Sequence, residues 1–285
     1  MHVTLLAMSG EVARFDASRT RAWAECPSAA LRDVCGVFTD IDDTLTRDGA
    51  IEAQALAALN RLAAAGVPVV AITGRPLGWC QPFAAAWPVA AIVAENGAVA
   101  LVRLGHRTLT EFVQNPAVRE TNALRLQQVA ARVLRDVPGS TLAQDSAGRA
   151  TDIAIDHSEF AHLGQAQIDQ VLAILRSEGM VATVSSIHVN GWFGDHSKLT
   201  AAHWMLQRLF GRRLSDEIDR WVYVGDSTND QLMFGAFALS VGVANLRRFA
   251  DRLQCWPAYI TQGERGAGFA EVAARLLQAR QCGAR

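Results

Sequence analysis

A short apolar run that ends abruptly in acid constrains this chain more than any other stretch. Residues 34–38 are rich in valine and phenylalanine, which is typical of a buried β-strand. The carboxylates Asp40 and Asp42 follow it, two residues apart. In an open α/β sheet, ligands bind at the carboxyl ends of the strands, so both acids are expected to face a ligand crevice. A polar turn or a helix cap is the other interpretation of this stretch.

Size and charge limit what kind of molecule this chain can form. Its 285 residues are 50% hydrophobic and 19% charged, which is enough for a sizeable core in one large domain or two modest ones. The net charge of −1, without blocks of like charge, favours neither nucleic acid nor a membrane surface as a partner. No apolar stretch is long enough for a signal peptide or a membrane span, so we expect a cytoplasmic protein.

Helices and strands are expected to alternate on both sides of a middle segment. Apolar periodicity predicts helices over 52–65, 76–87, 198–210 and 271–280. Valine-rich runs predict buried parallel strands over 67–72, 89–94, 221–224, 239–243 and 258–260. A glycine-rich stretch, 263–268, is expected to form a turn. This order predicts a doubly wound α/β core with a parallel sheet.

The middle of the chain has a different pattern. It is expected to contain helices over 117–135 and 165–176 and strands over 152–156, 181–185 and 188–192. We therefore expect an inserted α+β cap domain at residues 105–190, between two core parts at 1–104 and 191–285. Residues 1–33 form an N-terminal extension whose role the sequence does not indicate. An edge strand over 1–7 and a short helix over 28–32 are the elements expected there.

Four polar groups are expected at or beside the carboxyl ends of the parallel strands. They are Asp40 with Asp42, Thr73 with Gly74 and Arg75, Lys198 (the only lysine of the chain), and Asp226 with Asn229 and Asp230. Attack on a phosphate ester needs a carboxylate nucleophile and a neighbouring acid that transfers a proton. A hydroxyl, backbone amides and a lysine neutralise the phosphoryl oxygens, and further acids hold Mg²⁺.

In type and order, these groups resemble the signature motifs of the haloacid dehalogenase (HAD) superfamily of phosphohydrolases. From the first motif to the fourth, the matching stretches are 40–44, Thr73, Lys198 and 225–230. The insertion between the second and third motifs, preceded by Glu95, Asn96 and Gly97, resembles the type IIB cap of the Cof-like branch. That branch includes mannosyl-3-phosphoglycerate and sucrose-phosphate phosphatases. The resemblance covers residues 34–275.

The resemblance implies a role for each matching residue. Asp40 would be the nucleophile and Asp42 the general acid and base. Thr73 and Lys198 would hold the phosphoryl oxygens. Asp226 would bind Mg²⁺ together with the Asp40 side chain and the Asp42 main-chain carbonyl.

Six further residues have less defined expectations. Asp230 would support Lys198 or the metal shell, and Asn229 would contact phosphate or a metal-bound water. Gly74 is expected beside phosphate, whereas Arg75 either binds substrate or forms a surface salt bridge. His188 and Asn190 alternate on one strand and share a face that either touches substrate or packs.

The function implied by the resemblance is Mg²⁺-dependent hydrolysis of a small phosphorylated metabolite, with a sugar phosphate as the expected substrate. The reaction would pass through an aspartyl-phosphate. A phosphosugar mutase of the same superfamily remains an alternative. A non-enzymatic, receiver-like regulatory protein that binds phosphate is disfavoured by the length of the chain and by the insertion. The sequence indicates neither the particular substrate nor the oligomeric state.

Overall fold

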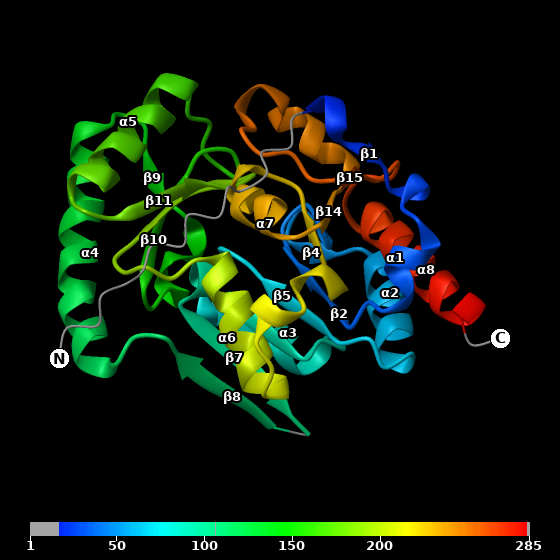
Figure 1. The fold of residues 1–285 in the computed structure, drawn as a ribbon. Coiled ribbons are helices and arrows are strands. Elements are labelled where there is room, and N and C mark those ends of the chain that lie inside the picture. The colour runs from blue at the N-terminus through cyan, green and yellow to red at the C-terminus, as the bar shows by residue number, and fades with distance from the viewer. Residues whose placement is uncertain (1–16, 106, 284–285) are drawn as a thin grey trace.

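The computed structural model describes residues 17–105 and 107–283 of the chain. This part forms a nine-stranded sheet, a four-stranded sheet and a small hairpin, with helices packed on the two larger sheets (Figure 1). The short helix expected over 28–32 is present as α1 (Ser28–Arg32). The edge strand expected over 1–7 lies outside the described residues. No helix within the described residues combines the length and the apolar character that crossing a membrane requires.

The large sheet is parallel over seven strands and ends in two antiparallel ones. In spatial order its strands are β1 (Arg21–Ala22), β15 (Tyr259–Ile260), β14 (Leu239–Gly242), β13 (Trp221–Gly225), β2 (Gly36–Thr39), β5 (Val69–Ile72), β6 (Ala91–Ala94), β7 (Val99–Leu104) and β8 (Arg107–Phe112). The predicted doubly wound α/β fold is confirmed. The inner strands β13, β2, β5 and β6 are buried along their whole length because both faces of the sheet are covered there.

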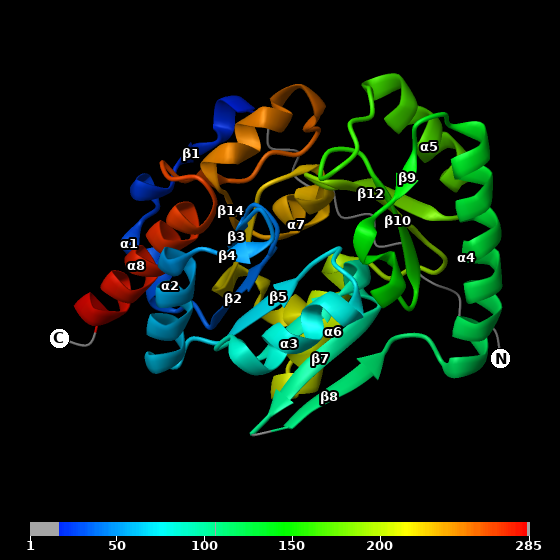
Figure 2. The same ribbon diagram turned by 180° about the vertical axis from the view of Figure 1, so that it is seen from behind.

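Helices cover the two faces of this sheet in separate layers. One layer contains α1, α2 (Ala53–Ala64), α3 (Leu77–Ala86) and α8 (Arg265–Gly283), and the other contains α6 (Lys198–Phe210) and α7 (Gln231–Ala236). Alternate residues of β5 enter opposite layers, with Val69 in the first and Val70 in the second. Figures 1 and 2 show α2 and α8 side by side at the end of the molecule away from the smaller sheet.

A four-stranded antiparallel sheet lies between β8 and α6 in the chain. Its order is β11 (Val181–Val184), β12 (His188–Trp192), β10 (Asp152–Asp156) and β9 (Thr141–Leu142). Helices α4 (Pro116–Asp136) and α5 (Gln165–Ser177) pack against one face, where Ile155 and Val189 join their apolar side chains. The opposite face carries His188 and Asn190, and it turns toward the nine-stranded sheet (Figure 2).

Some segments differ from the sequence expectation. Residues 107–112, which we expected inside the inserted domain, form an unpredicted strand, β8, that pairs with β7 in the large sheet. Helix α8 begins at Arg265, within the glycine-rich stretch that was expected to be a turn, so that prediction is wrong. Gly268 permits this early start, because a Cβ there would lie 2.5 Å from the Gly263 carbonyl oxygen. The acidic turn is followed by an unpredicted hairpin, β3 (Thr46–Arg47) with β4 (Ala50–Ile51).

Candidate active site

Three parallel strands end at the same level and bring their loops together. Thr39 in β2 is in register with Val224 in β13 and with Ala71 in β5. The residues that follow these positions therefore meet at one edge of the sheet, as expected for the carboxyl ends of parallel strands. Asp40 and Asp226 lie there, and Lys198 reaches the same place from the first turn of α6.

Lys198 links two of the buried acids. Its Nζ lies 2.6 Å from Asp40 Oδ1 and 2.7 Å from Asp230 Oδ1, and its side chain is only 3% exposed. Burial alone would lower the pKa of Lys198, but the charges and hydrogen bonds of Asp230 and Asp40 outweigh it and raise that pKa. The ammonium group therefore stays protonated and neutralises part of the acidic cluster.

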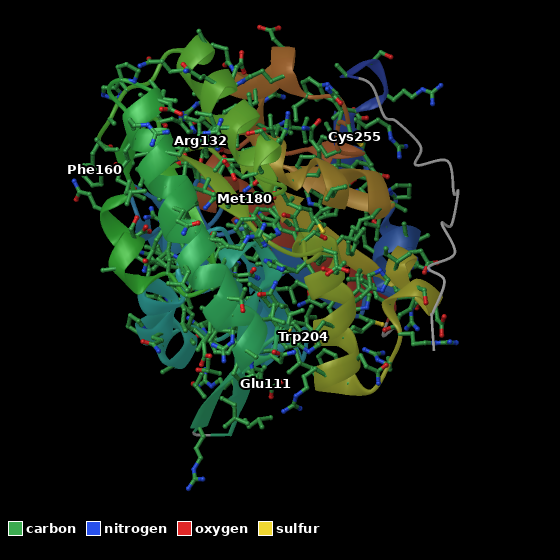
Figure 3. The ribbon with its side chains drawn as sticks, turned by 90° about the vertical axis from the view of Figure 1, so that its left-hand side faces the viewer. Glu111, Arg132, Phe160, Met180, Trp204 and Cys255 are labelled. Atoms are coloured by element: carbon green, nitrogen blue, oxygen red, sulfur yellow. The ribbon has the colours of Figure 1, made fainter. Side chains whose placement is uncertain are left out.

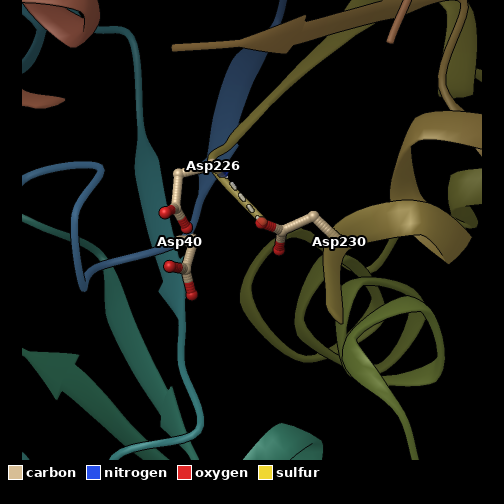
Figure 4. Close-up of side chains that lie close together, drawn as sticks. All are labelled: Asp40, Asp226 and Asp230. Atoms are coloured by element: carbon tan, nitrogen blue, oxygen red, sulfur yellow. Dashed lines mark hydrogen bonds between the residues drawn. The ribbon is translucent and has the colours of Figure 1, made fainter. Parts of the chain in front are cut away.

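Asp230 is the most fully bonded acid of the site. Its Oδ2 accepts the backbone N–H groups of Asp226 at 2.9 Å and Ser227 at 3.1 Å (Figure 4). Its Oδ1 accepts from Lys198 and from the hydroxyl of Tyr223. Four donors occupy the acceptor positions of this carboxylate. Asp230 therefore shapes the loop after β13 and orients Lys198.

The site fits a divalent cation. Asp40, Asp226 and Asp230 each place a carboxylate oxygen within 4.8 Å of the others (Figure 4). Asp226 Oδ1 is buried and has no hydrogen-bond partner among the described residues. Burial raises the pKa of Asp226 well above its ordinary value, and the charges of Asp40 and Asp230 add to that increase. Buried, unpaired carboxylate oxygens suit Mg²⁺, and because Asp230 is already bonded, the side chains free to hold the ion are Asp40 and Asp226.

The Asp42 carboxylate forms an ion pair with an arginine. Nε of Arg75 lies 3.0 Å from each carboxylate oxygen of Asp42. Burial raises the pKa of Asp42, while Arg75 opposes that shift. A carboxyl group with a raised pKa is suited to donate a proton. The Arg75 side chain is only 6% exposed, so its ion pairs are buried, and of the two alternatives expected for it the surface salt bridge is wrong.

The loop after β5 presents the Thr73 hydroxyl, and at Gly74 it lets the inserted segment approach the core closely. Thr73 Oγ1 accepts the backbone N–H of Arg75 at 3.0 Å, which leaves the hydroxyl hydrogen available for a ligand. The carbonyl of Gly74 accepts a hydrogen bond from Arg149 of the inserted segment at 3.0 Å. A Cβ at position 74 would lie 3.3 Å from the side chain of Asn190, so glycine lets the two parts of the molecule meet.

The structure also gives the contacts of two other predicted residues, Asn229 and His188. Asn229 accepts a hydrogen bond from Ser227 Oγ at 2.9 Å. His188 contacts Glu159, not the phosphoryl site. The structure instead brings in Asn245, whose Nδ2 lies 3.3 Å from Asp226 Oδ2. Asn245 comes two residues after the strand predicted over 239–243, so the rule that polar residues follow strands would have found it.

Buried carboxylates also fix the inserted segment to the core. Glu95, at the end of β6, accepts the backbone N–H of Ala150 at 3.0 Å and that of Thr151 at 2.6 Å. Arg75 donates to Asp145 at 3.2 Å and to Glu159 at 2.9 Å, both of which belong to the inserted segment. Sequence reasoning missed these contacts because they join residues far apart in the chain.

A cavity of about 480 Å³ opens beside Asp42. It lies between the β3–β4 hairpin, the loops of the inserted sheet and the start of α8. Its lining includes Asp42, Thr46, Arg75, Ser158, Glu159 and Arg265. Asp42 thus stands between the acid cluster and a space large enough for a small metabolite.

A doubly wound sheet, a buried cluster of acids with one lysine at its carboxyl edge, and an inserted α+β segment over that edge define a doubly wound α/β protein with a buried acidic site. A family model described as haloacid dehalogenase-like hydrolase matches residues 37–122. Over this segment the chain is similar to these hydrolases. This match agrees with the predicted family, and a relative named as a phosphatase agrees with the predicted class of enzyme.

Individual relatives agree with this assignment. The chain is 26% identical to a phosphoglycolate phosphatase of Methanothermobacter thermautotrophicus over 85% of this chain and 98% of that protein. A crystal structure from Thermoplasma acidophilum matches with a TM-score of 0.66 at 15% identity, over 86% of this chain and 98% of that one. A sucrose-phosphatase from Synechocystis sp., in complex with sucrose and phosphate, matches with a TM-score of 0.60 at 16% identity, over 84% of this chain and 96% of that one.

Proposed function

We propose that this protein is an Mg²⁺-dependent phosphatase that hydrolyses a small sugar phosphate through an aspartyl-phosphate at Asp40. The observation that carries the proposal is the buried Lys198, which bridges Asp40 and Asp230 beside the unpartnered oxygen of Asp226. This combination of one cation, one bonded acid and two acids with free oxygens suits a phosphoryl group and a metal ion together. We place the reaction in the cytoplasm.

In the first half of the reaction, Asp40 attacks phosphorus. Lys198 holds Oδ1 of Asp40, and Oδ2 has no protein partner among the described residues, so Oδ2 is the attacking atom. The bond between phosphorus and the leaving oxygen breaks, and Asp42 donates its proton to that oxygen. Lys198 and the Thr73 hydroxyl stabilise the charge on the phosphoryl oxygens.

In the second half, water releases the phosphate. Asp42, now ionised, accepts a proton from water while the water oxygen attacks phosphorus, and the bond from phosphorus to Asp40 breaks. Free phosphate leaves, and both aspartates return to their starting states. The Asp40 and Asp226 side chains and the Asp42 carbonyl would hold Mg²⁺, which would supply positive charge to the phosphoryl group.

We further propose that residues 113–192 act as a cap over this site. Glu95 and Gly74 hold one side of the segment to the core, and Arg75 contacts it next to Asp42. A cap in this position excludes bulk water, which strengthens electrostatic interactions inside the site. The phosphatase names of the curated relative and of the Synechocystis structure support a phosphate ester as the substrate.

The test is phosphate release by the purified protein from a panel of phosphorylated sugars, polyols, glycerates and nucleotides, with Mg²⁺ or with EDTA. Asp40→Asn serves as the nucleophile variant. Asp219→Asn, at an exposed position outside the site, is the matched control. We expect Mg²⁺-dependent release that Asp219→Asn retains and Asp40→Asn loses. Release that persists in Asp40→Asn, or no release from any compound, would contradict the proposal.

A further inference from the structure

The cavity beside Asp42 receives the leaving group of the substrate in the proposed reaction. Asp42 would protonate the leaving oxygen, and it lines this cavity, whereas Asp40 does not. The rest of the leaving group must therefore extend past Asp42 into the space between the hairpin and the inserted segment. The side chains found there decide which leaving groups fit.

The arginines of this cavity are already paired with carboxylates. Arg75 contacts Asp42 and Glu159, and Arg265 lies 2.7 Å from Asp43. Arg248, which is half exposed, lies 3.4 Å from Glu264. Among the described lining residues, no arginine is left without an acidic partner for a second anionic group of the substrate.

Glu159 is the acid that the inserted segment adds to the cavity. Its Oε1 accepts from Arg75 at 2.9 Å, and its Oε2 lies 2.9 Å from Nε2 of His188. Burial alone would raise the pKa of Glu159, but the hydrogen bond to His188 and the charge of Arg75 outweigh it and lower that pKa to about 2. Glu159 therefore remains an anion that can accept further hydrogen bonds at any physiological pH.

A buried acid fixes the loop that carries Glu159. Oδ1 of Asp156 accepts the backbone N–H groups of Ser158 and Glu159, and Oδ2 accepts those of Phe160 and Ala161. These four distances lie between 2.9 and 3.1 Å. Glu159 is therefore held in place before substrate arrives, as a specificity group must be.

We infer that Glu159 determines specificity: it accepts hydrogen bonds from the hydroxyl groups of a neutral sugar or polyol leaving group and repels leaving groups that carry a carboxylate. This inference rests on the proposed phosphatase function. It predicts that this chain prefers other substrates than phosphoglycolate, whose leaving group is a small carboxylate.

Two other features of the cavity agree with a sugar. Its volume of about 480 Å³ falls in the ordinary range for metabolite pockets, which is larger than a two-carbon acid needs. Phe160 lines the rim and is 61% exposed, at the periphery of the molecule in Figure 3. Its ring offers an apolar surface to the carbon face of a sugar, while Glu159 faces the hydroxyl groups.

The experiment compares kcat/KM for phosphoglycolate with that for the best of glucose 6-phosphate, fructose 6-phosphate and glycerol 3-phosphate. It uses the parent protein, Glu159→Gln and a control, Glu178→Gln. Glu178 also pairs with an arginine of the inserted segment, Arg132, but lies outside the cavity. p-Nitrophenyl phosphate reports whether the catalytic groups still work in each protein.

We expect the parent and Glu178→Gln to prefer a neutral ester, and Glu159→Gln to reduce that preference at least tenfold, as loss of a hydrogen bond to a charged group predicts. A preference unchanged in Glu159→Gln, or a parent that prefers phosphoglycolate, overturns this inference alone. Loss of p-nitrophenyl phosphate hydrolysis in both Glu159→Gln and Glu159→Ala also overturns it, because Glu159 would then act on the chemistry through Arg75. Failure of the parent to hydrolyse any ester overturns the proposed function together with it.

Discussion

Lys198 is the only lysine among 285 residues, and the fold buries it between two acids. Arginine supplies the remaining basic side chains, including those that line the cavity. A guanidinium is a planar fork, whereas an ammonium group is compact and can approach two carboxylates and a phosphoryl oxygen from one point. The chain therefore keeps its one ammonium side chain where a compact cation is needed.

This single lysine gives a direct test of the site in the intact protein. Acetic anhydride should not modify Lys198 in the native state, because it is buried and its raised pKa keeps it protonated. Intact mass should show acetylation of the chain's α-amino group at most. One additional acetyl group should appear when the reaction is done in urea. Modification of Lys198 in the native protein at the rate of a free lysine would contradict this placement.

His196 predicts how stability depends on pH. It is 3% exposed, stacks on Trp192, and neither ring nitrogen has a partner among the described residues. It lines a cavity of about 650 Å³ between the links to the inserted segment, near Glu111 and Trp204 (Figure 3). Burial lowers its pKa from 6.5 to about 4, although Asp195 acts in the opposite direction.

The unfolded chain therefore binds a proton at His196 at a higher pH than the folded chain does. The contribution of His196 to the free energy of unfolding is fully present above pH 6.5 and is lost as the pH falls from 6.5 toward 4. Between pH 7 and pH 5, the free energy of unfolding should fall by about 2 kcal/mol from this residue. His196→Phe keeps an aromatic ring on Trp192 and removes this titration. Urea unfolding at pH 7 and pH 5 should show a smaller loss in the variant. An equal loss in both proteins would assign the effect to other groups.

Residues whose positions follow from strand ends could be predicted from the sequence. Asp40, Thr73 and Asp226 each follow an apolar run, and parallel strands bring such positions to one edge. Glu159 could not be assigned by that rule. Glu159 reaches the site through a contact between two separate sheets, and no local pattern encodes which of their loops will meet.

At the scale of elements, the segment from β10 to Ala161 is a preformed loop held by one carboxylate. Asp156 is 1% exposed and accepts four backbone N–H groups. Buried hydrogen bonds to a charged group contribute about 1.5–3 kcal/mol each, so the loop depends strongly on this side chain.

Asp156→Asn should loosen this loop and leave the acid cluster intact. The asparagine amide keeps one acceptor oxygen. Its NH₂ group replaces the second carboxylate oxygen and faces two backbone N–H groups, to which it cannot hydrogen-bond as an acceptor. We expect faster hydrogen–deuterium exchange over residues 158–161 and a kcat/KM for the best substrate that is at least tenfold lower. Asp169→Asn, at an exposed position of α5, is the control. Unchanged exchange in Asp156→Asn would show that the loop has another source of order.

The accuracy of the element predictions depended on the length and periodicity of each segment. The long amphipathic helix α4 and the apolar strand β5 were located within two residues, because both have a clear period. Strands β7 and β8 were missed, since they form an antiparallel extension outside the expected alternation of helix and strand. The start of α8 was missed because glycines usually indicate turns, whereas here they permit close packing.

At the scale of the whole molecule, we expect the acid cluster to make stability depend on Mg²⁺. The ion would neutralise the buried carboxylates of Asp40 and Asp226 in the folded state only. At a Mg²⁺ concentration ten times its dissociation constant, binding stabilises the fold by about 1.4 kcal/mol, which raises Tm by roughly 3 °C. Thermal unfolding with Mg²⁺ and with EDTA measures this difference.

Asp226→Asn supplies the matched comparison for that measurement. The variant removes a buried charge that has an unpartnered oxygen, so in EDTA it should melt no lower than the parent protein. Mg²⁺ should no longer raise its Tm. A Mg²⁺ effect of equal size in parent and variant would mean that the ion binds elsewhere.

Arg75 belongs to the core but touches both parts of the molecule. Two of its three acidic partners, Asp145 and Glu159, lie in the inserted segment, and the third is Asp42. If the segment swings away to admit substrate, those two contacts break while the guanidinium stays beside Asp42. Its whole positive charge then acts on the proton donor and favours the ionised form, which cannot protonate a leaving group. The open molecule would therefore not hydrolyse a bound ester. An ester too bulky for the inserted segment to close over it would not be cleaved.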